Sequence, residues 1–402
     1  MRILIVTPSI PYPPNWGFGI RVYQIVRELS RRHTVSVVCY SRPGEEDKIA
    51  ALNEVCHSVH TVQNPLADRR AKRLAQLAAM VRRTSFQTAS LRTAAMQRLV
   101  TSLVANERFD LVQFESSQMC SLRLPAGLPW IVDEHNLEYE LLQRMGQTER
   151  TPIRKLFNWV EHRKFKREEM SSWERADACV VTSDREARVV AQHVPHKPIH
   201  VAPNGVDIEF FSPADPTDVA VDPDEMVFTG LLSYRPNADA VTYFVKQILP
   251  LIVARRPRAR FTVVGLDAPP EMIRLAGPNV DIVGAVPDVR PYVVRAGLFV
   301  VPLRMGSGTR LKILEGLAAA KGVVSTTVGC EGIDVVADEH LLVADTEADF
   351  ADAVVSLQSD PRRADELGRA GRQLVEDRYS WVSIVNELDG FHRSIVNPTG
   401  QS

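Results

Sequence analysis

The sequence contains few cysteines and no long hydrophobic run. Its five cysteines are scattered among 402 residues, are odd in number and form no Cys-x-x-Cys pair. This pattern argues against a disulfide framework or a zinc site and fits a reducing compartment. The first apolar run, MRILIVTPSI, is short and ends at Thr-Pro, so we expect a strand there and not a signal peptide. Because no stretch approaches the roughly 20 apolar residues of a membrane span, we expect a cytoplasmic protein.

The chain also carries almost no net charge, which gives no reason to expect a nucleic-acid partner. The total of −1 hides an asymmetry: residues 1–200 hold 29 Lys and Arg against 21 Asp and Glu, and residues 201–402 hold 19 against 28. The two halves are therefore expected to be different bodies. Their opposite signs serve either to attract the halves to each other or to bring the basic half to an anionic partner or the inner face of a membrane.

Short β-rich runs alternate with helical stretches along the whole chain. In the first half the runs are RILIVT, TVSVVCY, DLVQFE, PWIVDEH and ACVVTS, and in the second half EMVFTG, ARFTVVG, VDIVG, LFVVPL, GVVST and HLLVA. Helical stretches include residues 21–32, 68–83 and 152–176. This alternation predicts two α/β domains with Rossmann-like, doubly wound parallel sheets that face a central cleft.

The join between the domains is predicted within residues 195–225, which are rich in Pro, Asp and Asn-Gly. We place the first domain at residues 1–200 and the second at residues 201–379.

A glycine pair after the first strand raises the possibility of a dinucleotide site. Gly17, Phe18 and Gly19 resemble the start of the Gly-x-Gly-x-x-Gly fingerprint. However, ten residues separate the first strand from the second half of this motif, and the next strand ends in Tyr40-Ser41 with no carboxylate for a ribose hydroxyl. A dehydrogenase is therefore disfavoured.

The stretch RMGSGTRLKILEGLAAAKGVVST, residues 304–326, predicts a glycine loop, a helix and a strand. Gly306 and Gly308 allow close approach to a ligand, and Thr309 can cap a helix whose first N–H groups form an anion site. Arg310 and Lys312 lie in the first turn, where the helix dipole disfavours cations.

A bound diphosphate would satisfy the dipole and both cations together. The alternative is a solvent-exposed turn in which Lys312 pairs with Glu315 three residues on. Under the phosphate interpretation, Glu315 faces the same cleft and accepts hydrogen bonds from ribose hydroxyls.

Six segments, in this order, resemble the family 4 glycosyltransferases of the two-domain GT-B fold. They are PYPPNWGFGIR after the first strand, DEHN at 133–136, WERADACVVTSDREA at 173–187, VAPNGVDIEFFSP at 201–213, FTGLLSYRPNADAVTYFVKQILP at 228–250 and GSGTRLKILEGLAAAKGVVSTTVGCEGI at 306–333. The resemblance implies a retaining, metal-independent hexosyltransferase. Its donor would be a nucleotide diphosphate sugar, and a UDP-sugar is the donor expected first. No further cofactor is implied. The last helix, near residues 380–402, is expected to pack back onto the first domain.

The resemblance also implies roles for single residues. His135 would lie beside the donor sugar and its leaving phosphate, Glu315 would hold the ribose, and Gly17 would approach the diphosphate. Catalytic roles are expected for His135, Arg310 and Lys312. The expected donor-binding residues are Gly17, Phe18, Gly19, Arg235, Asn237, Gly306, Ser307, Gly308, Thr309 and Glu315.

Three departures from the family pattern concern the donor site. Ser307 replaces the first glutamate of the family's E-x7-E motif, and Phe18 replaces a glycine. The family's phosphate-binding arginine and lysine fall on Leu231 and Pro236. We therefore expect Arg310 and Lys312 to replace those cations, with Arg235 as a helper.

No pair of general acid and base residues is expected from the sequence. Asp222-Pro-Asp224 has the D-x-D form that metal-dependent glycosyltransferases use, but its place in the predicted join favours a turn.

The acceptor is not identified by the sequence, and a sugar or an aglycone fits. Residues 69–98 carry eight Lys or Arg, and residues 154–166 read RKLFNWVEHRKFK. These are either solvated helix faces or basic helices for a phosphorylated acceptor or peripheral contact with anionic lipid. An epimerase or a phosphorylase of the same fold, and a non-catalytic nucleotide-sugar binder, remain alternatives.

Overall fold

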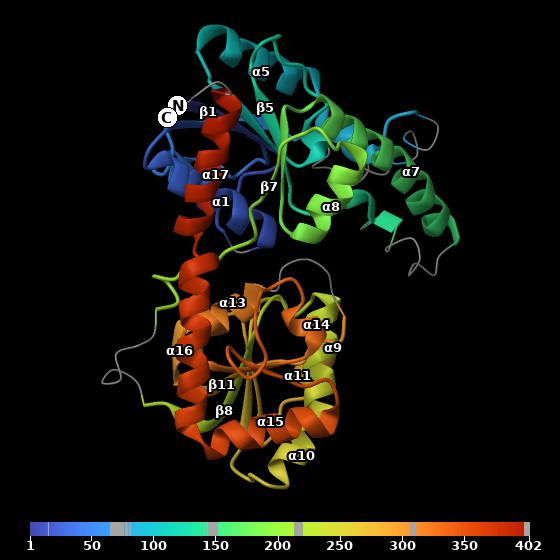
Figure 1. The fold of residues 1–402 in the computed structure, drawn as a ribbon. Helices are drawn as coiled ribbons and strands as arrows, with labels where there is room; N and C mark the ends of the chain where they lie inside the picture. Colours follow the sequence, from blue (N-terminus) through green and yellow to red (C-terminus); the bar gives the residue numbers. More distant parts are fainter. Residues whose placement is uncertain are drawn as a thin grey trace. The chain divides into compact units, whose positions relative to one another are not determined.

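The computed structural model describes residues 1–14, 16–64, 76, 79, 82–140, 142–143, 152–212, 220–305 and 311–397. The chain divides into two compact units (Figure 1). The first comprises Met1–Pro203 and Ile384–Ser402, and the second comprises Asn204–Ser383. The division after Pro203 lies within the proline-rich stretch at residues 195–225.

The first unit is built around a seven-stranded parallel sheet in the order β3-β2-β1-β4-β5-β6-β7. Its strands are β1 (Arg2–Thr7), β2 (Thr34–Ser41), β3 (Ser58–Gln63), β4 (Leu111–Glu115), β5 (Trp130–Glu134), β6 (Ala178–Val181) and β7 (Ile199–Val201). The central strands are buried along nearly their whole length, as expected of a parallel sheet covered on both faces. The strand order reverses between β1 and β4, where ligands bind in such sheets.

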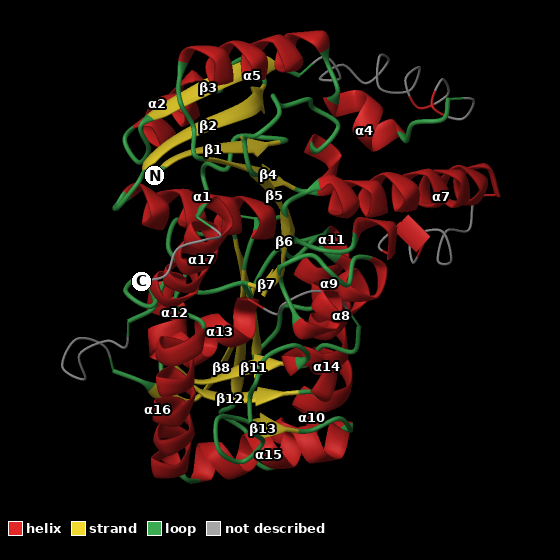
Figure 2. Cartoon of the chain, turned by 45° about the horizontal axis from the view of Figure 1, so that its top comes forward, coloured by secondary structure: helices red, strands yellow, loops and turns green. Residues whose placement is uncertain are grey.

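Helices cover the faces of this sheet (Figure 2). The helices are α1 (Gly17–Ser30), α2 (Glu46–Asn53), α4 (Phe86–Leu91), α5 (Ala94–Asn106), the 3-10 helix η1 (Ser117–Met119), α7 (Pro152–Arg175), α8 (Asp184–His193) and α17 (Trp381–Val396). Hydroxyl caps fix several starts: Ser85, Thr93 and Ser183 accept backbone N–H groups of α4, α5 and α8. The helix expected over residues 68–83 lies mostly outside the described residues.

The last helix joins the first unit through polar and aromatic contacts. Asp389 of α17 lies 2.7 Å from Nε2 of His33, and the ring of Phe391 stacks on His200 at 5.0 Å. The chain therefore returns to its first unit at its carboxyl end.

The second unit contains a six-stranded parallel sheet in the order β10-β9-β8-β11-β12-β13. Its strands are β8 (Asp222–Thr229), β9 (Arg260–Val264), β10 (Val280–Gly284), β11 (Ala296–Val301), β12 (Gly322–Ser325) and β13 (Leu342–Val343). Its helices are α9 (Arg235–Tyr243), the π-helix η2 (Phe244–Ile248), α10 (Leu249–Val253), α11 (Pro270–Ile273), α12 (Arg290–Arg295), α13 (Leu311–Ala318), α14 (Thr327–Cys330), α15 (Glu347–Ser359) and α16 (Pro361–Arg378). Here the order reverses between β8 and β11.

One local prediction is wrong. Asp222-Pro-Asp224 opens the central strand β8 and does not form a turn. Asp224 is buried, and its Oδ1 accepts a hydrogen bond of 2.7 Å from Arg256. The aspartate is therefore a structural ion-pair partner, because the strand carries it into the protein interior.

The packing of α16 against the end of α13 makes a specific prediction about two helical glycines. A Cβ at Gly368 would overlap the carbonyl oxygen of Ala320, whereas a Cβ at Gly390 would meet nothing within 4 Å. We expect Gly368→Ala to lower the free energy of unfolding by about 1–3 kcal/mol through overpacking. Gly390→Ala is expected to raise it by up to about 1 kcal/mol through helix propensity. Urea unfolding measures both changes, and equal effects of the two substitutions would contradict this packing.

Candidate functional site

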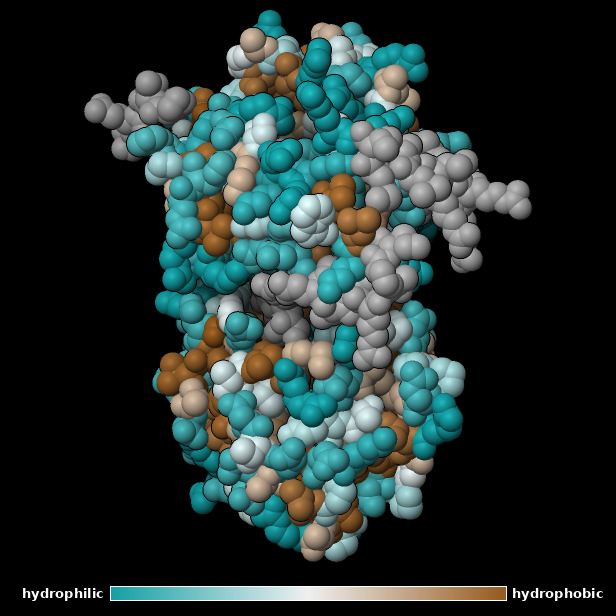
Figure 3. Space-filling view, turned by 90° about the vertical axis from the view of Figure 1, so that its right-hand side faces the viewer, coloured by the Kyte–Doolittle hydropathy of each residue, from teal (hydrophilic) through white to brown (hydrophobic). Residues whose placement is uncertain are grey.

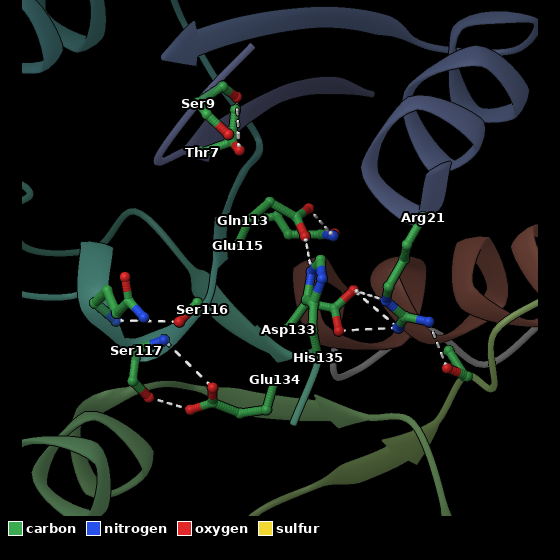
Figure 4. A network of polar contacts seen from close by, with 12 residues as sticks. Thr7, Ser9, Arg21, Gln113, Glu115, Ser116, Ser117, Asp133, Glu134 and His135 are labelled. Carbon is green, nitrogen blue, oxygen red and sulfur yellow. Dashed lines mark hydrogen bonds and ion pairs between the residues drawn. The ribbon is translucent and has the colours of Figure 1, made fainter. Parts of the chain in front are cut away.

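Four polar side chains gather at the carboxyl ends of β4 and β5 in the first unit. Glu115 ends β4, Asp133 lies near the end of β5, His135 follows β5, and Arg21 reaches them from α1 (Figure 4). We call these four residues the first-unit cluster. They lie beside the point at which the strand order reverses, so they occupy the usual ligand-binding edge of such a sheet.

His135 is held on two sides. Its Nε2 lies 2.7 Å from Oε2 of Glu115, whose Oε1 accepts a hydrogen bond of 2.8 Å from Gln113. The ring of Phe18 stacks on the imidazole with centroids 4.5 Å apart. The stacked ring of Phe18 therefore fixes the orientation of the histidine ring.

Burial makes His135 a neutral side chain. It lowers the pKa of the imidazole to about 4, and it raises the pKa of Glu115 to about 7 against the opposing charge of Arg21. Nδ1 of His135 is buried and has no hydrogen-bond partner among the described residues. A neutral imidazole can position a substrate hydroxyl through this atom, but it supplies no positive charge at neutral pH. This state therefore suits the positioning of a substrate and not the stabilisation of a negative charge.

Arg21 and Asp133 form an ion pair with almost no contact with water. The side chains are 1% and 0% exposed, and three hydrogen bonds of 2.9–3.2 Å join the guanidinium to both carboxylate oxygens. Burial raises the pKa of Asp133, and the charge of Arg21 opposes this rise. The guanidinium also donates to the carbonyls of Ala202 and Pro203. It thereby ties α1 and β5 to the segment where the chain leaves the first unit.

The cluster also has the spacing of a metal site. Glu115, Asp133 and His135 each offer one ligand atom, and these atoms lie within 4.8 Å of one another. However, Arg21 already places a cation against both oxygens of Asp133. A divalent ion would be repelled by this guanidinium and would have to displace its hydrogen bonds. The donor set therefore fits an internal cation better than a metal ion.

A second group of polar residues gathers in the second unit at the carboxyl end of β8. We call Thr229, Gly230, Asn237, Lys312 and Glu315 the second-unit cluster. Oε2 of Glu315 accepts a hydrogen bond of 3.0 Å from Thr229, and Nζ of Lys312 donates one of 2.5 Å to Oδ1 of Asn237. The backbone φ of Gly230 is +148°, a conformation that favours glycine, and a Cβ there would lie 2.9 Å from the Asn237 side chain.

This second cluster holds a cation and a carboxyl group close together. Nζ of Lys312 lies 4.3 Å from the ring centre of Phe228, an arrangement that favours a positive charge. Burial raises the pKa of Glu315, and the Thr229 hydrogen bond and Lys312 oppose the rise. The charges of Lys312 and Glu315 interact, and each side chain also has its own hydrogen-bond partner, Asn237 for Lys312 and Thr229 for Glu315.

The structure places some of the expected donor-site residues close together. Asn237, Lys312 and Glu315 lie together in the second unit, and Phe18 contacts His135 in the first. Gly17 and Gly19 lie in the first turn of α1, where a Cβ at Gly19 would lie 2.8 Å from the Trp16 ring. Arg235 is exposed at the start of α9, and no contact of its side chain with the described residues joins it to the cluster. The expected loop residues Gly306, Ser307, Gly308, Thr309 and Arg310 lie outside the described residues.

Sequence reasoning missed Arg21, Glu115 and Asp133 in the first unit and Thr229 and Gly230 in the second. Each comes at the end of a buried strand or one helical turn after a glycine. Charged or hydroxyl residues at strand ends were the available signal, but many such residues occur in the chain. The partner that gives each one its function is distant in sequence.

The comparison with known proteins now identifies the family. Residues 17–210 match the model described as Glycosyltransferase Family 4, and residues 223–360 match the model described as Glycosyl transferases group 1. The chain belongs to the family 4 glycosyltransferases. Glycosyl transfer is therefore its activity class, and neither an epimerase, a phosphorylase nor a non-catalytic binder is supported.

Full-length relatives of this glycosyltransferase have modest sequence identity. The chain is 24% identical to alpha-maltose-1-phosphate synthase of Mycolicibacterium smegmatis, over 98% of this chain and 100% of the relative. Among solved structures it is similar to sucrose-phosphate synthase from Thermosynechococcus elongatus, with a TM-score of 0.70, 17% identity and coverage of 99% and 100% of the two chains. It is also similar to the Anabaena protein HepE in complex with UDP, with a TM-score of 0.68, 15% identity and coverage of 98% and 100%. These similarities establish the GT-B fold.

A search of the helices in the described ranges found none with the length and apolar content needed to cross a membrane.

The buried ion pair of this glycosyltransferase predicts a large stability effect. Arg21→Met would leave the carboxylate of Asp133 buried without its partner, which typically costs about 3–5 kcal/mol. We expect a loss of this size in the free energy of unfolding, measured by urea titration of the tryptophan fluorescence. Arg188→Met, at an exposed arginine of α8, is the control and should change stability by less than about 0.5 kcal/mol. A loss below about 1 kcal/mol for Arg21→Met would contradict a desolvated pair.

His135 predicts a pH dependence. Its pKa falls from 6.5 in the unfolded chain to about 4 in the folded protein, so its contribution to stability is present above pH 6.5 and is lost as the pH falls towards 4. The wild type should therefore lose stability between pH 6.5 and 4 relative to His135→Gln.

The measurement is the urea midpoint of both proteins across this range. The pKa of Glu115 is raised, so its own contribution has the opposite sign. Comparing the variant with the wild type at each pH separates the histidine from this background. Parallel curves for the two proteins, or an imidazole that titrates near pH 6.5 by NMR, would show that the ring is not buried neutral.

Proposed function

We propose that this glycosyltransferase is a retaining, metal-independent hexosyltransferase that moves a sugar from a UDP-sugar to an acceptor hydroxyl. The observation that carries the proposal is the second-unit cluster, in which Lys312 and Glu315 lie at the strand end where the sheet order reverses. The similarity of the fold to HepE, whose structures contain UDP and UDP-glucose, supports UDP as the nucleotide.

The two side chains suit the two parts of a nucleotide diphosphate. The carboxyl group of Glu315, held by Thr229, accepts hydrogen bonds from the ribose hydroxyls. Lys312, at the start of α13, compensates the charge that develops on the diphosphate as the sugar leaves. The first-turn N–H groups of α13 point in the direction that favours an anion. The sequence places Arg310 two residues before Lys312, and the proposal gives it the same role.

The first-unit cluster positions the reactants. His135, neutral and held by Glu115 and Phe18, uses Nδ1 to hold a hydroxyl of the donor sugar or the acceptor. α1 has no acidic residue in its first turn and no side-chain cap, so its N–H groups beside Gly17 are suited to a phosphate.

Retention enters this proposal from the family resemblance and not from the geometry of the two clusters. The leaving diphosphate takes the proton of the acceptor hydroxyl on the face from which it departs, and the new bond forms on that face. The proton goes to a phosphate oxygen and the electron pair of the broken bond stays with the diphosphate. No carboxylate pair and no metal ion is required in this proposal, because Lys312 compensates the charge on the leaving diphosphate.

Peripheral membrane contact is a further part of the proposal. Leu156 and Trp159 of α7 are about half exposed, and Arg163 lies over the Trp159 ring at 3.8 Å. Basic and aromatic side chains on one helix are typical of interfacial contact.

The donor site is tested by UDP affinity, measured by calorimetric titration in the presence of a chelator. UDP is expected to bind, and Lys312→Gln and Glu315→Gln are each expected to weaken it about tenfold or more. Lys246→Gln, an exposed lysine of the same unit, is the matched control and should leave the affinity unchanged. Equal binding by all four proteins would refute the site.

Turnover tests the reaction class. Slow hydrolysis of the preferred UDP-sugar without acceptor should release the α-anomer first by NMR, and a chelator should not abolish it. Initial release of the β-anomer would exclude retention, and loss of turnover that divalent ions restore would exclude metal independence.

A further inference from the structure

The first unit contains a cavity of about 370 Å³ that is distinct from the two clusters, bordered by α4, η1 and α7. Figure 2 shows α4 beside α7, and Figure 3 shows that much of the side of this unit seen there is hydrophilic. The lining contains six serines and threonines, one glutamate and four arginines. We call it the arginine pocket and define it by Arg92, Arg123, Arg167 and Arg175.

Helical spacing places two of these arginines together. Arg167, Ser171 and Arg175 follow one another at intervals of four on α7, so they share one face of that helix. Arg175 donates hydrogen bonds to the carbonyls of Ser171 and Cys120, which are neutral acceptors. Its position is therefore fixed without loss of its positive charge.

The positive charge of the pocket is not compensated by the described residues. No carboxylate among them forms an ion pair with any of the four arginines. The one acidic lining residue, Glu168, is engaged by Ser85 and Thr88: its oxygens accept from the backbone N–H of Ser85 and from both hydroxyls at 2.5–2.7 Å. Four arginines and one glutamate thus line the cavity.

The floor of the pocket offers hydroxyl groups. Ser117 and Ser172 are 3% and 2% exposed. Oγ of Ser121 is buried and has no hydrogen-bond partner among the described residues. The hydroxyls of Ser117 and Ser172 already donate to Glu134 and to the carbonyl of Glu168. The donors that remain for a ligand are the arginines and the Ser121 hydroxyl, and such a set suits the oxygens of an anion.

Ser117 connects the pocket with the first-unit cluster. It follows Glu115 by two residues, and both its hydroxyl and its backbone N–H donate to the carboxylate of Glu134 (Figure 4). Glu134 directly precedes His135. The pocket therefore borders the strand ends that carry the first-unit cluster.

We propose that the arginine pocket binds a phosphate group carried by the acceptor. This rests on the proposed function, because it assigns the ligand of the acceptor side of the same reaction. A phosphate monoester, with about two negative charges, matches three excess positive charges better than a singly charged carboxylate does. Planar guanidinium groups bind its oxygens in bidentate fashion, and the cavity has the size of a small-ligand site. The acceptor is thus a phosphorylated sugar or a lipid with a phosphate headgroup.

The test uses glucose 6-phosphate and glucose as probes of the full chain, with affinities measured by calorimetric titration at about 0.15 M salt. Glucose 6-phosphate should bind and glucose should not. Arg167→Gln and Arg175→Gln should each weaken glucose 6-phosphate about tenfold. Arg188→Gln is the matched control, since its Nε donates to the carbonyl four residues earlier, as Arg175 does. UDP affinity is measured on every protein and should not change.

A vesicle arm separates the two sources of phosphate. Sedimentation with phosphatidylglycerol vesicles, against phosphatidylcholine vesicles, detects a lipid headgroup. Binding that Arg167→Gln weakens and Arg188→Gln does not, to either the sugar phosphate or the anionic vesicles, supports the pocket and names the source.

Three outcomes would overturn the proposal. One is the absence of binding to both phosphate probes while UDP still binds, which leaves the donor site standing. The second is equal weakening by Arg167→Gln and Arg188→Gln, which indicates diffuse surface charge. The third is loss of UDP affinity in Arg167→Gln, which assigns the pocket to the donor. Conversely, specific phosphate binding without any UDP binding or turnover would overturn the proposed function and retain the pocket.

Discussion

The ion pair of Arg21 and Asp133 fixes the position of the chemical groups in the first unit. Both side chains are removed from water, so each charge depends on the other for compensation. The guanidinium reaches α1, β5 and the carbonyls of Ala202 and Pro203 at the same time. Because Phe18 lies one turn before Arg21 on α1, and His135 lies two residues after Asp133, this contact also sets the stacking of the aromatic ring on the imidazole.

The ionisable side chains of the two clusters differ in their state of charge. In the first unit a buried histidine becomes neutral and shares a short contact with Glu115, so positioning by hydrogen bonds is what the cluster offers. In the second unit Lys312 lies over an aromatic face and contacts an amide oxygen, so a cation is available. Glu315 beside it has its carboxyl group held by Thr229. In the proposed function, the neutral histidine orients hydroxyl groups and the cation of Lys312 stabilises the leaving diphosphate.

Local patterns in the sequence predicted much of the fold, because a parallel strand buried on both faces is an uninterrupted apolar run. RILIVT and LFVVPL illustrate this: they became β1 and most of β11. β3 and β7 were not predicted, since Ser58–Gln63 and Ile199–Val201 are only partly buried and carry polar residues. Asp222-Pro-Asp224 was assigned to a turn because its composition is typical of turns, although the strand it opens is central to its sheet.

The sequence by itself determined which residue types were available for chemistry and which strands and helices carry them. His135, Lys312 and Glu315 could be named from their motifs, and the fold class could be named from the alternation of strands and helices. Only the tertiary structure decided their partners. Arg21 and Asp133 are 112 positions apart, Thr229 and Glu315 are 86 apart, and Glu115 and His135 are 20 apart. Such pairs depend on the order of strands in a sheet, which arises from packing the whole domain and leaves no signature in a short stretch of sequence.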